Sequence, residues 1–378
     1  MSPGEPRKVC ALVCIATVLL ASGCSPTPPS PSPDPLGLSS GDAHSCALGS
    51  DGSIKCWGWN SYGQLGDGTE GSRSYPAPVL QLSGATQVAS GGRHTCALVS
   101  GGTVKCWGNG SQGELGVGST SSSPTPVNVV GISGASQISV GYEHSCALFP
   151  TGLVSCWGRG YEGQLGDGLN LEHDTAIRVS ITNVVQISAG HFHTCALVLG
   201  GTVKCWGFNA FGALGDGTND DHIVPVSVVG VTGASQVVAG DQRSCALVAG
   251  GTVKCWGDNE RGQLGDGTTV GSDTPVDVLG VSRATQITSR TSACALIDDG
   301  SVRCWGASPA GDGTFTDHGS AVVVVGVTDA IHVSAGYGST CVLIRGGSVK
   351  CWGGNGVGQL GNGNYRDSQT PVDVVALP

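Results

Sequence analysis

The chain has 378 residues, of which 64 are glycine; 12% are charged, 5% are aromatic, and the formal net charge is −10. The low charge excludes a disordered polyelectrolyte, and glycine without a strict three-residue period excludes collagen. An acidic chain without a run of Lys or Arg also disfavours nucleic acid as a partner, because phosphates bind basic surfaces. Many short strands joined by glycine-rich turns fit this composition better.

The first part of the chain has the features of a targeting signal. A short basic region precedes an apolar stretch, Val9–Leu20, that is too short to span a bilayer. The LLASGC that follows resembles the lipobox of bacterial lipoproteins, with Ala21 where Leu is usual. The resemblance implies that residues 1–23 are a signal peptide and that Cys24 is lipidated. The alternative is an ordinary cleaved signal with an incidental cysteine.

Residues 24–35 are predicted to be the lipidated cysteine and a Pro/Ser-rich linker. SPTPPSPSPDP cannot bury a core and favours extended polyproline II, so we interpret it as a stalk. Acyl chains on Cys24 would hold the exported chain at a membrane. Ser25, rather than Asp, after this cysteine implies by the same resemblance the outer membrane or cell surface of a diderm bacterium.

From there on, the chain repeats one pattern seven times. HSCALGSDGSIKCWG, which begins at His44, returns as HTCALVSGGTVKCWG, HSCALFPTGLVSCWG and further near-copies. Each copy carries two cysteines ten positions apart, and the copies begin 47 to 50 residues apart. A period near 50 indicates a propeller or an array, and seven copies of four short strands would close a ring. We therefore predict an all-β fold, a seven-bladed β-propeller, over residues 36–378.

Each unit is predicted to hold four strands, A to D. The tight turn between B and C predicts a hairpin, and the short D-to-A connection predicts a second pairing. About 18 residues separate C from D, so we expect this connection to cross between blades and each blade to have the order D-A-B-C. The two chain ends would then share one blade. In the second unit the expected strands are Gln87–Ser90, His94–Val99, Thr103–Trp107 and Pro126–Val130.

These motifs resemble the regulator of chromosome condensation repeat family. The resemblance rests on the fifteen-residue pattern and on the GQLGDGT that follows it, as at Gly63–Thr69 and Gly262–Thr268. It implies a seven-bladed β-propeller. Unit six departs from the pattern with WGASPAGDGT at Trp305–Thr314, so its long loop is expected to be shorter.

The paired cysteines are predicted to be one disulfide per blade. A B–C turn centred on residue 51 places residue 46 directly opposite residue 56, close to disulfide range. Zinc is the alternative, but each blade offers only two sulfurs. An exported chain would meet the oxidising compartment that disulfides need. The predicted pairs are Cys46 with Cys56, Cys96 with Cys106, Cys146 with Cys156, Cys195 with Cys205, Cys245 with Cys255, Cys294 with Cys304, and Cys341 with Cys351.

A tryptophan follows the second cysteine of every unit. We interpret these side chains as filler between blades, the alternative being a carbohydrate platform. They are Trp57, Trp107, Trp157, Trp206, Trp256, Trp305 and Trp352.

No pattern in the repeats indicates catalysis. His44 and its equivalents lie on separate blades, whereas a metal needs converging ligands, so a bond to a neighbouring loop is the simpler interpretation. Asp67 and its equivalents are typical of turns, with calcium as the alternative. Asn60 of the first unit and Gly110 of the second stand at equivalent positions, and both residue types tolerate a positive φ, so we predict a positive φ at this position. We predict no catalytic residue, no metal and no cofactor.

The loops differ most between units, and they suggest a binding face. The A–B and C–D loops emerge at one end of the ring and carry exposed aromatics with a few charges, as protein contacts do. The alternative is that some of these side chains fill the central channel. The candidates are Trp59, Tyr62, Tyr142, Arg159, Tyr161, Phe192, Phe208 and Phe211.

We therefore expect a non-enzymatic, monomeric binding or scaffold propeller, held outside the cytoplasm by lipid, with an unknown protein or glycan as partner. One alternative is a secreted enzyme inhibitor similar to beta-lactamase inhibitory protein II, a relative within the same family. Another is a polysaccharide-active enzyme, which would need acid and base groups in one cleft. The family founder's guanine nucleotide exchange is not expected, because an exported chain would not meet a nuclear GTPase.

Overall fold

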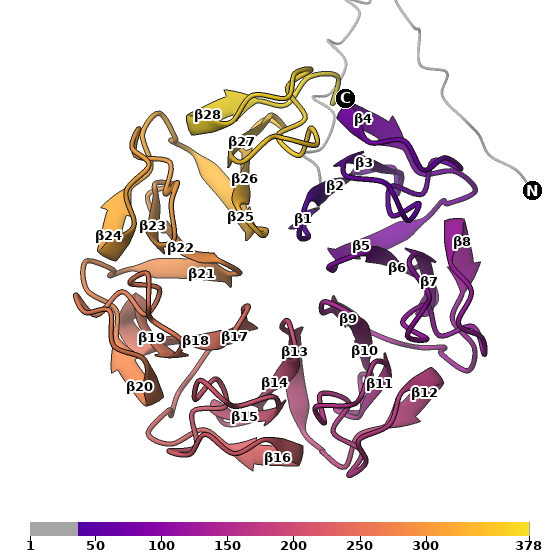
Figure 1. Ribbon diagram of the computed structural model, residues 1–378, viewed down its shortest axis with the longest axis horizontal. Coiled ribbons are helices and arrows are strands. Elements are labelled where there is room, and N and C mark those ends of the chain that lie inside the picture. The colour runs from indigo at the N-terminus through magenta and orange to yellow at the C-terminus, as the bar shows by residue number, and fades with distance from the viewer. Residues whose placement is uncertain (1–36, 378) are drawn as a thin grey trace, which may run out of the picture. The chain divides into compact units, whose positions relative to one another are not determined.

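The computed structural model describes residues 37–377, which form seven four-stranded antiparallel sheets around a central axis (Figure 1). The predicted all-β, seven-bladed β-propeller is therefore confirmed. Blades one to seven follow the order of the chain, and the strands of each blade run from the axis outward. The predicted signal peptide and linker, with Cys24, lie outside the described residues.

Each blade contributes one strand to each of four positions. The innermost strands are β1 (Gly37–Ser40), β5 (Ala85–Ser90), β9 (Gln137–Val140), β13 (Val184–Ala189), β17 (Gln236–Ala239), β21 (Ala284–Ser289) and β25 (Ala330–Ala335). The second strands are β2 (His44–Leu48), β6 (His94–Val99), β10 (His144–Leu148), β14 (His193–Val198), β18 (Arg243–Val248), β22 (Ser292–Ile297) and β26 (Ser339–Ile344). The third strands are β3 (Ile54–Gly58), β7 (Thr103–Gly108), β11 (Val154–Gly158), β15 (Thr202–Gly207), β19 (Thr252–Gly257), β23 (Val302–Gly306) and β27 (Val349–Gly353). The outermost strands are β4 (Arg73–Pro78), β8 (Ser123–Asn128), β12 (His173–Arg178), β16 (His222–Ser227), β20 (Ser272–Asp277), β24 (His318–Val323) and β28 (Ser368–Asp373). A 3₁₀ turn, η1 (Ala249–Gly251), joins β18 to β19.

The blades are continuous segments of chain, so the predicted D-A-B-C order was wrong. In blade one, β3 pairs with β4 of the same unit, with Cys56 opposite Ala77 and Gly58 opposite Arg73. The first and last blades are each complete, and the chain ends do not share a blade (Figure 1). In the second unit the outermost strand spans Ser123–Asn128, three residues earlier at its start than predicted.

The long loop between the third and fourth strands explains the error. In blade one, residues 59–72 cross to blade two and then return to their own sheet. The Gln64 carbonyl accepts the Trp107 Nε1–H at 2.9 Å, and the Gly68 N–H donates to the Pro124 carbonyl at 3.1 Å. The loop of blade seven closes the ring in the same way, because the Gln359 carbonyl accepts the Trp57 Nε1–H at 3.0 Å.

The hydrophobic core lies between successive blades. One cluster joins Leu48, Ile54 and Leu65 of blade one to Val88 and Trp107 of blade two. Every repeat tryptophan is 0% exposed, which confirms that these side chains are filler between blades rather than a platform. Burying an aromatic of this size at each junction is a large part of what holds a ring of separate sheets together.

The predicted disulfides are all present, one in each blade. The two cysteines of a blade lie directly opposite each other on its second and third strands, with Cα atoms 4.0–4.1 Å apart. All fourteen cysteines of the described residues are paired in this way, so the bonds join strands within a blade and leave the contacts between blades to non-covalent packing. The bonds join Cys46 to Cys56, Cys96 to Cys106, Cys146 to Cys156, Cys195 to Cys205, Cys245 to Cys255, Cys294 to Cys304, and Cys341 to Cys351.

The loop of unit six is shorter, as predicted. Residues 307–317 separate β23 from β24, whereas residues 59–72 separate β3 from β4. Within residues 37–377, no helix has the length and hydrophobicity needed to span a membrane.

Candidate functional site

The same hydrogen-bond relay recurs at every junction between successive blades from blade one to blade five. In the first junction, the Thr95 hydroxyl donates to the Gln64 carbonyl at 2.9 Å and lies 2.8 Å from Nε2 of His44. Because the hydroxyl hydrogen is already used, His44 carries its proton on Nε2 and donates it to the oxygen. The equivalent donors and hydroxyls are His94 with Ser145, His144 with Thr194, and His193 with Ser244.

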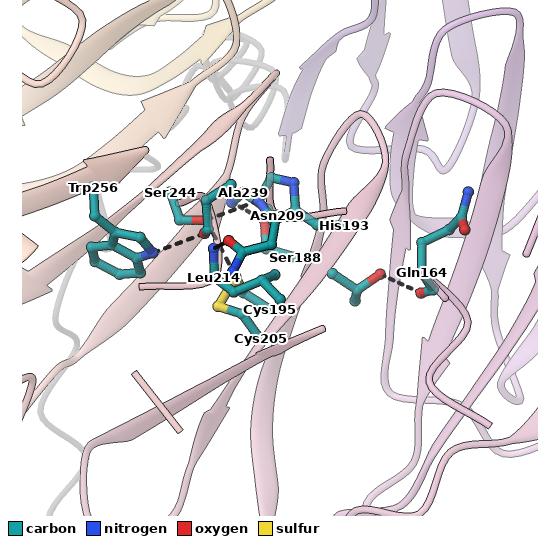
Figure 2. The surroundings of a disulfide bond; sticks show 12 residues. Gln164, Ser188, His193, Cys195, Cys205, Asn209, Leu214, Ala239, Ser244 and Trp256 are labelled. Carbon is teal, nitrogen blue, oxygen red and sulfur yellow. Dashed lines mark hydrogen bonds between the residues drawn. A yellow bond between two sulfur atoms is a disulfide. The ribbon is translucent and has the colours of Figure 1, made fainter. Parts of the chain in front are cut away.

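Figure 2 shows the relay at the junction of blades four and five. The Ala213 carbonyl accepts both the Trp256 Nε1–H and the Ser244 hydroxyl, each at 2.9 Å, beside the Cys195–Cys205 disulfide. Burial lowers the pKa of each of the four relay histidines to about 3, so they are neutral at pH 7. Each therefore bonds to the neighbouring blade as a structural group, although its partner lies on a strand rather than the predicted loop. No three His, Cys, Asp or Glu side chains gather as a metal site within residues 37–377.

The repeated asparagine acts through its side chain, and the predicted positive φ was wrong. Neither Asn60 nor Gly110 has a positive φ. The Asn60 side-chain oxygen accepts the Leu65 N–H at 2.8 Å, and its Nδ2 donates to the Thr69 carbonyl at 3.0 Å. At Gly110 the returning chain comes closer, and an added Cβ would lie 2.2 Å from the Ser121 carbonyl. Asparagine thus holds the long loop together, and glycine replaces it where no side chain fits.

The structure brings the predicted binding-face residues together in one curved row, which we call the aromatic arc. It comprises the eight predicted residues and one more, Arg93: Trp59, Tyr62, Arg93, Tyr142, Arg159, Tyr161, Phe192, Phe208 and Phe211. All of them lie on A–B and C–D loops of blades one to four.

Neighbouring members of the arc contact one another from blade to blade. The Arg93 guanidinium lies 5.3 Å from the centre of the Tyr62 ring and 5.4 Å from that of Tyr142. Phe192 continues the row, 5.8 Å from Tyr142 and 6.4 Å from Phe208. The ring contacts are edge-on or tilted, and each cation over a ring adds an electrostatic attraction.

Carboxylates hold the two arginines of the arc in place. Glu143 is 3.0 Å from a terminal nitrogen of Arg159 and 3.7 Å from one of Arg93. Arg159 also binds Glu162, at 2.5 Å. These bonds fix the arginines over the rings of Tyr142 and Phe192, so the arc is organised before any partner binds.

The arc faces solvent rather than the channel. Tyr161 is 50% exposed and Phe211 41% exposed, and the other members are half-buried. The cavity at the channel, about 210 Å³, is lined by residues of the innermost strands and by Arg290, and by no member of the arc. The alternative that the aromatics fill the channel therefore has no support from their positions.

Arg93 was the residue missed from the sequence. It lies directly before His94, as Glu143 does before His144 and Phe192 before His193. Comparing the residue before each relay histidine would have placed it on the same face. Its role depends on the contact between blades, which a single repeat does not reveal.

The fold and these repeats define an RCC1-like propeller. The model of the RCC1-like domain matches residues 24–324, and that of the regulator of chromosome condensation (RCC1) repeat matches residues 330–359. The chain belongs to the RCC1-like family.

Several solved structures share the fold at low sequence identity. Prp20p of Saccharomyces cerevisiae, described with its binding to Gsp1p and histones, is 22% identical, with 85% of each chain covered and a TM-score of 0.74. Human WBSCR16 is 22% identical over 85% of this chain and 94% of that one, with a TM-score of 0.76. The CRINKLY ectodomain of the Arabidopsis thaliana receptor kinase ACR4 is 19% identical over 89% and 98%, with a TM-score of 0.54.

Proposed function

We propose that this protein is a non-enzymatic binding propeller that engages a partner protein through the aromatic arc. The observation that carries the proposal is the continuity of the arc, in which each junction from blade one to blade four contributes a contact between side chains. Clustered aromatics and arginines are the residues that contribute most to binding at protein interfaces. A non-catalytic role agrees with the relay histidines, which are buried, neutral and bonded to the neighbouring blade.

The geometry of the arc favours a protein over a glycan. Stacking on a sugar needs a flat exposed ring face, whereas rings here meet edge-on and Arg159 covers the faces of Tyr161 and Phe192. The row also spans four blades, which is the width of a protein contact rather than of a single small ligand. A yeast protein of the same fold is described as binding Gsp1p and histones, so the fold supports protein binding elsewhere.

We further propose that the chain is exported, acts as a monomer and is held at a membrane by lipid on Cys24. Seven disulfides are expected of a protein that folds in an oxidising compartment. The similar ACR4 propeller is itself an ectodomain. Labelled palmitate should enter the full chain but not Cys24→Ser, and incorporation into Cys24→Ser would reject the anchor at this residue.

The arc is tested by comparing two triple variants of the full chain in pull-downs from cell-envelope extracts. Tyr161→Ala/Phe208→Ala/Phe211→Ala removes three aromatics of the arc, and we expect its partner band to fall by about tenfold or more. The matched control, Leu199→Ala/Phe315→Ala/Tyr365→Ala, removes residues that are 73%, 60% and 55% exposed outside the arc. Equal capture by both variants and the parent would reject the arc as the binding face.

A further inference from the structure

The junction between blades five and six departs from the relay. Arg243 stands where the earlier units have histidine, and Ala293 stands where they have Ser or Thr. The loop between β21 and β22 is also one residue shorter than its equivalents. Arg243 donates from a terminal nitrogen to the Arg290 carbonyl, so it still closes the junction, although with a much larger side chain.

This substitution leaves a buried donor free. Arg243 is 1% exposed, and its Nε–H has no hydrogen-bond acceptor among residues 37–377. Burial lowers the pKa of the guanidinium to about 10, which still leaves it charged at pH 7. A buried N–H without an acceptor is costly in free energy, so an acceptor supplied by a ligand would stabilise this side chain.

Arg243 lines a cavity of about 320 Å³ that opens on the same end of the propeller as the aromatic arc. Its charged and aromatic lining also includes Asp241, Asp258, Glu260, Arg261 and Tyr337. A second cavity of about 420 Å³ shares Asp258 and Glu260 with the first, and reaches Phe211 and Asp273. We call the two cavities together the polar groove; each is lined by one aromatic side chain, Phe211 in one and Tyr337 in the other.

Only some of the polar side chains that line the groove have hydrogen-bond partners within the protein. Asp258 accepts from the Gln263 side chain at 2.7 Å and from the Glu260 N–H at 3.2 Å. Asp241 lies 3.1 Å from His191 Nδ1 without hydrogen-bond geometry. The Glu260 carboxylate is exposed, and Tyr337 is 54% exposed. A ligand would therefore meet free acceptors on the carboxylates and a free donor on Arg243.

We propose that this groove binds a neutral oligosaccharide, with one sugar between Arg243 and Tyr337 and the next toward Phe211. A hydroxyl can accept from the Arg243 Nε–H and donate to a carboxylate in the same contact. A cationic side chain would leave the Arg243 Nε–H unpaired, because an ammonium or guanidinium group donates hydrogen bonds and accepts none. An anionic ligand would be repelled by Asp241, Asp258 and Glu260. The two aromatic rings offer apolar surface to the sugar rings.

The inference does not rest on the protein contact proposed for the aromatic arc. The arc lies on loops of blades one to four, whereas Arg243, Glu260 and Tyr337 belong to blades five to seven. Phe211 is the member that the two surfaces share.

The test measures binding of cello-, malto-, xylo- and chitotriose to the purified full chain by calorimetry. We expect at least one trisaccharide to bind, and to bind more tightly than its monosaccharide. Tyr337→Ala should weaken it by about tenfold, and Glu260→Gln by about fivefold. The matched controls Tyr365→Ala and Glu70→Gln alter an equally exposed tyrosine and a glutamate outside the groove, and should leave the affinity within about twofold.

Two outcomes would overturn the inference. One is that no trisaccharide binds at concentrations up to about 10 mM, whether or not arginine methyl ester binds. The other is that Tyr337→Ala and Tyr365→Ala weaken sugar binding equally. The variant Trp59→Ala/Tyr142→Ala separates the two proposals, because it should reduce capture of a partner protein and leave sugar binding unchanged.

Discussion

The junctions that join successive blades from one to five differ sharply from the junction that joins blades five and six. In the former, the histidine Nε2–H, the hydroxyl and the tryptophan Nε1–H each donate to an acceptor within the relay, as at His44, Thr95 and Trp107. In the latter, Ala293 provides no hydroxyl, and both the Trp305 Nε1–H and the Arg243 Nε–H lack acceptors among residues 37–377. The loops above the regular junctions carry the aromatic arc, and the cavity that Arg243 lines lies above the irregular one.

The innermost turn shows the same difference. In blades one to five and in blade seven a glycine begins this turn, and an added Cβ at Gly91 would lie 2.2 Å from the Gly141 carbonyl. Blade six has Arg290 there, in the shorter turn, and its guanidinium reaches the Val140 carbonyl at 3.4 Å on the far side of the channel. Two departures from the repeat, Arg243 and Arg290, therefore contact each other at the junction of blades five and six.

Removing one relay histidine is expected to have the largest effect on stability. His144→Ala leaves a buried space and removes the donor to the Thr194 hydroxyl oxygen, and should lower the free energy of unfolding by about 3 kcal/mol. Ser292→Ala, at the equivalent position of blade six, should cost about 0.5 kcal/mol. Urea unfolding followed by tryptophan fluorescence measures both.

The conservative variant His144→Gln distinguishes the relay from simple packing. Its amide nitrogen can donate to the Thr194 hydroxyl, so it should recover part of the loss. Equal losses for His144→Ala and Ser292→Ala would show that the relay contributes no more than the irregular junction.

The next prediction concerns Glu114, which lies within the relay where units one, three, five and seven have glutamine. It is 0% exposed and accepts from the Asn109 side chain at 2.5 Å and from the Gln112 N–H at 2.7 Å. Burial raises the pKa of its carboxyl to about 7. The folded state therefore retains a proton that the unfolded state loses near pH 4.5, and this group's contribution to stability falls as pH rises from 4.5 to 7.

Glu114→Gln should remove that pH dependence. Above pH 8 the variant should be more stable than the parent by about 2 kcal/mol, and at pH 4 the two should be alike. Thermal unfolding across this pH range measures the gap, with Gln164→Glu as the reverse exchange in blade three. A gap that does not change with pH would mean that the carboxyl is ionised in the folded state.

A feature of this fold can be predicted from the sequence when the contacts that determine it lie within a single repeat. The disulfides follow from the spacing of Cys46 and Cys56, because a hairpin's register is set locally. The strand order within a blade does not follow from the sequence. The loop at Gln64 contacts Trp107 of the next blade, and the length of this loop does not tell whether the chain then continues in the next blade or returns to its own sheet. The side-chain role of Asn60 was missed for a similar reason, since its partners lie across the loop rather than beside it.

The binding surfaces follow the same rule. Aromatic loop residues such as Tyr161 and Phe208 are visible in the sequence as departures from the repeat. Arg93 and Arg243 acquire their meaning only from neighbouring blades, through the rings of Tyr62 and Tyr142 in one case and the Arg290 carbonyl in the other. The partners that individual side chains have on the neighbouring blade were therefore the part that sequence alone did not reveal.

The smallest predicted effect isolates one hydrogen bond of the relay. Trp206 donates its Nε1–H to the Gln164 carbonyl at 3.0 Å, whereas the Trp305 Nε1–H has no acceptor among residues 37–377. Both side chains are 0% exposed, so replacing either with phenylalanine removes the same volume. Trp206→Phe should therefore cost about 1 kcal/mol more than Trp305→Phe, the net worth of the lost bond. In Trp206→Phe the Gln164 carbonyl still accepts the Thr194 hydroxyl, so only the tryptophan hydrogen bond is lost. Equal unfolding midpoints for the two variants in urea would therefore mean that this hydrogen bond adds nothing to the stability of the regular junctions.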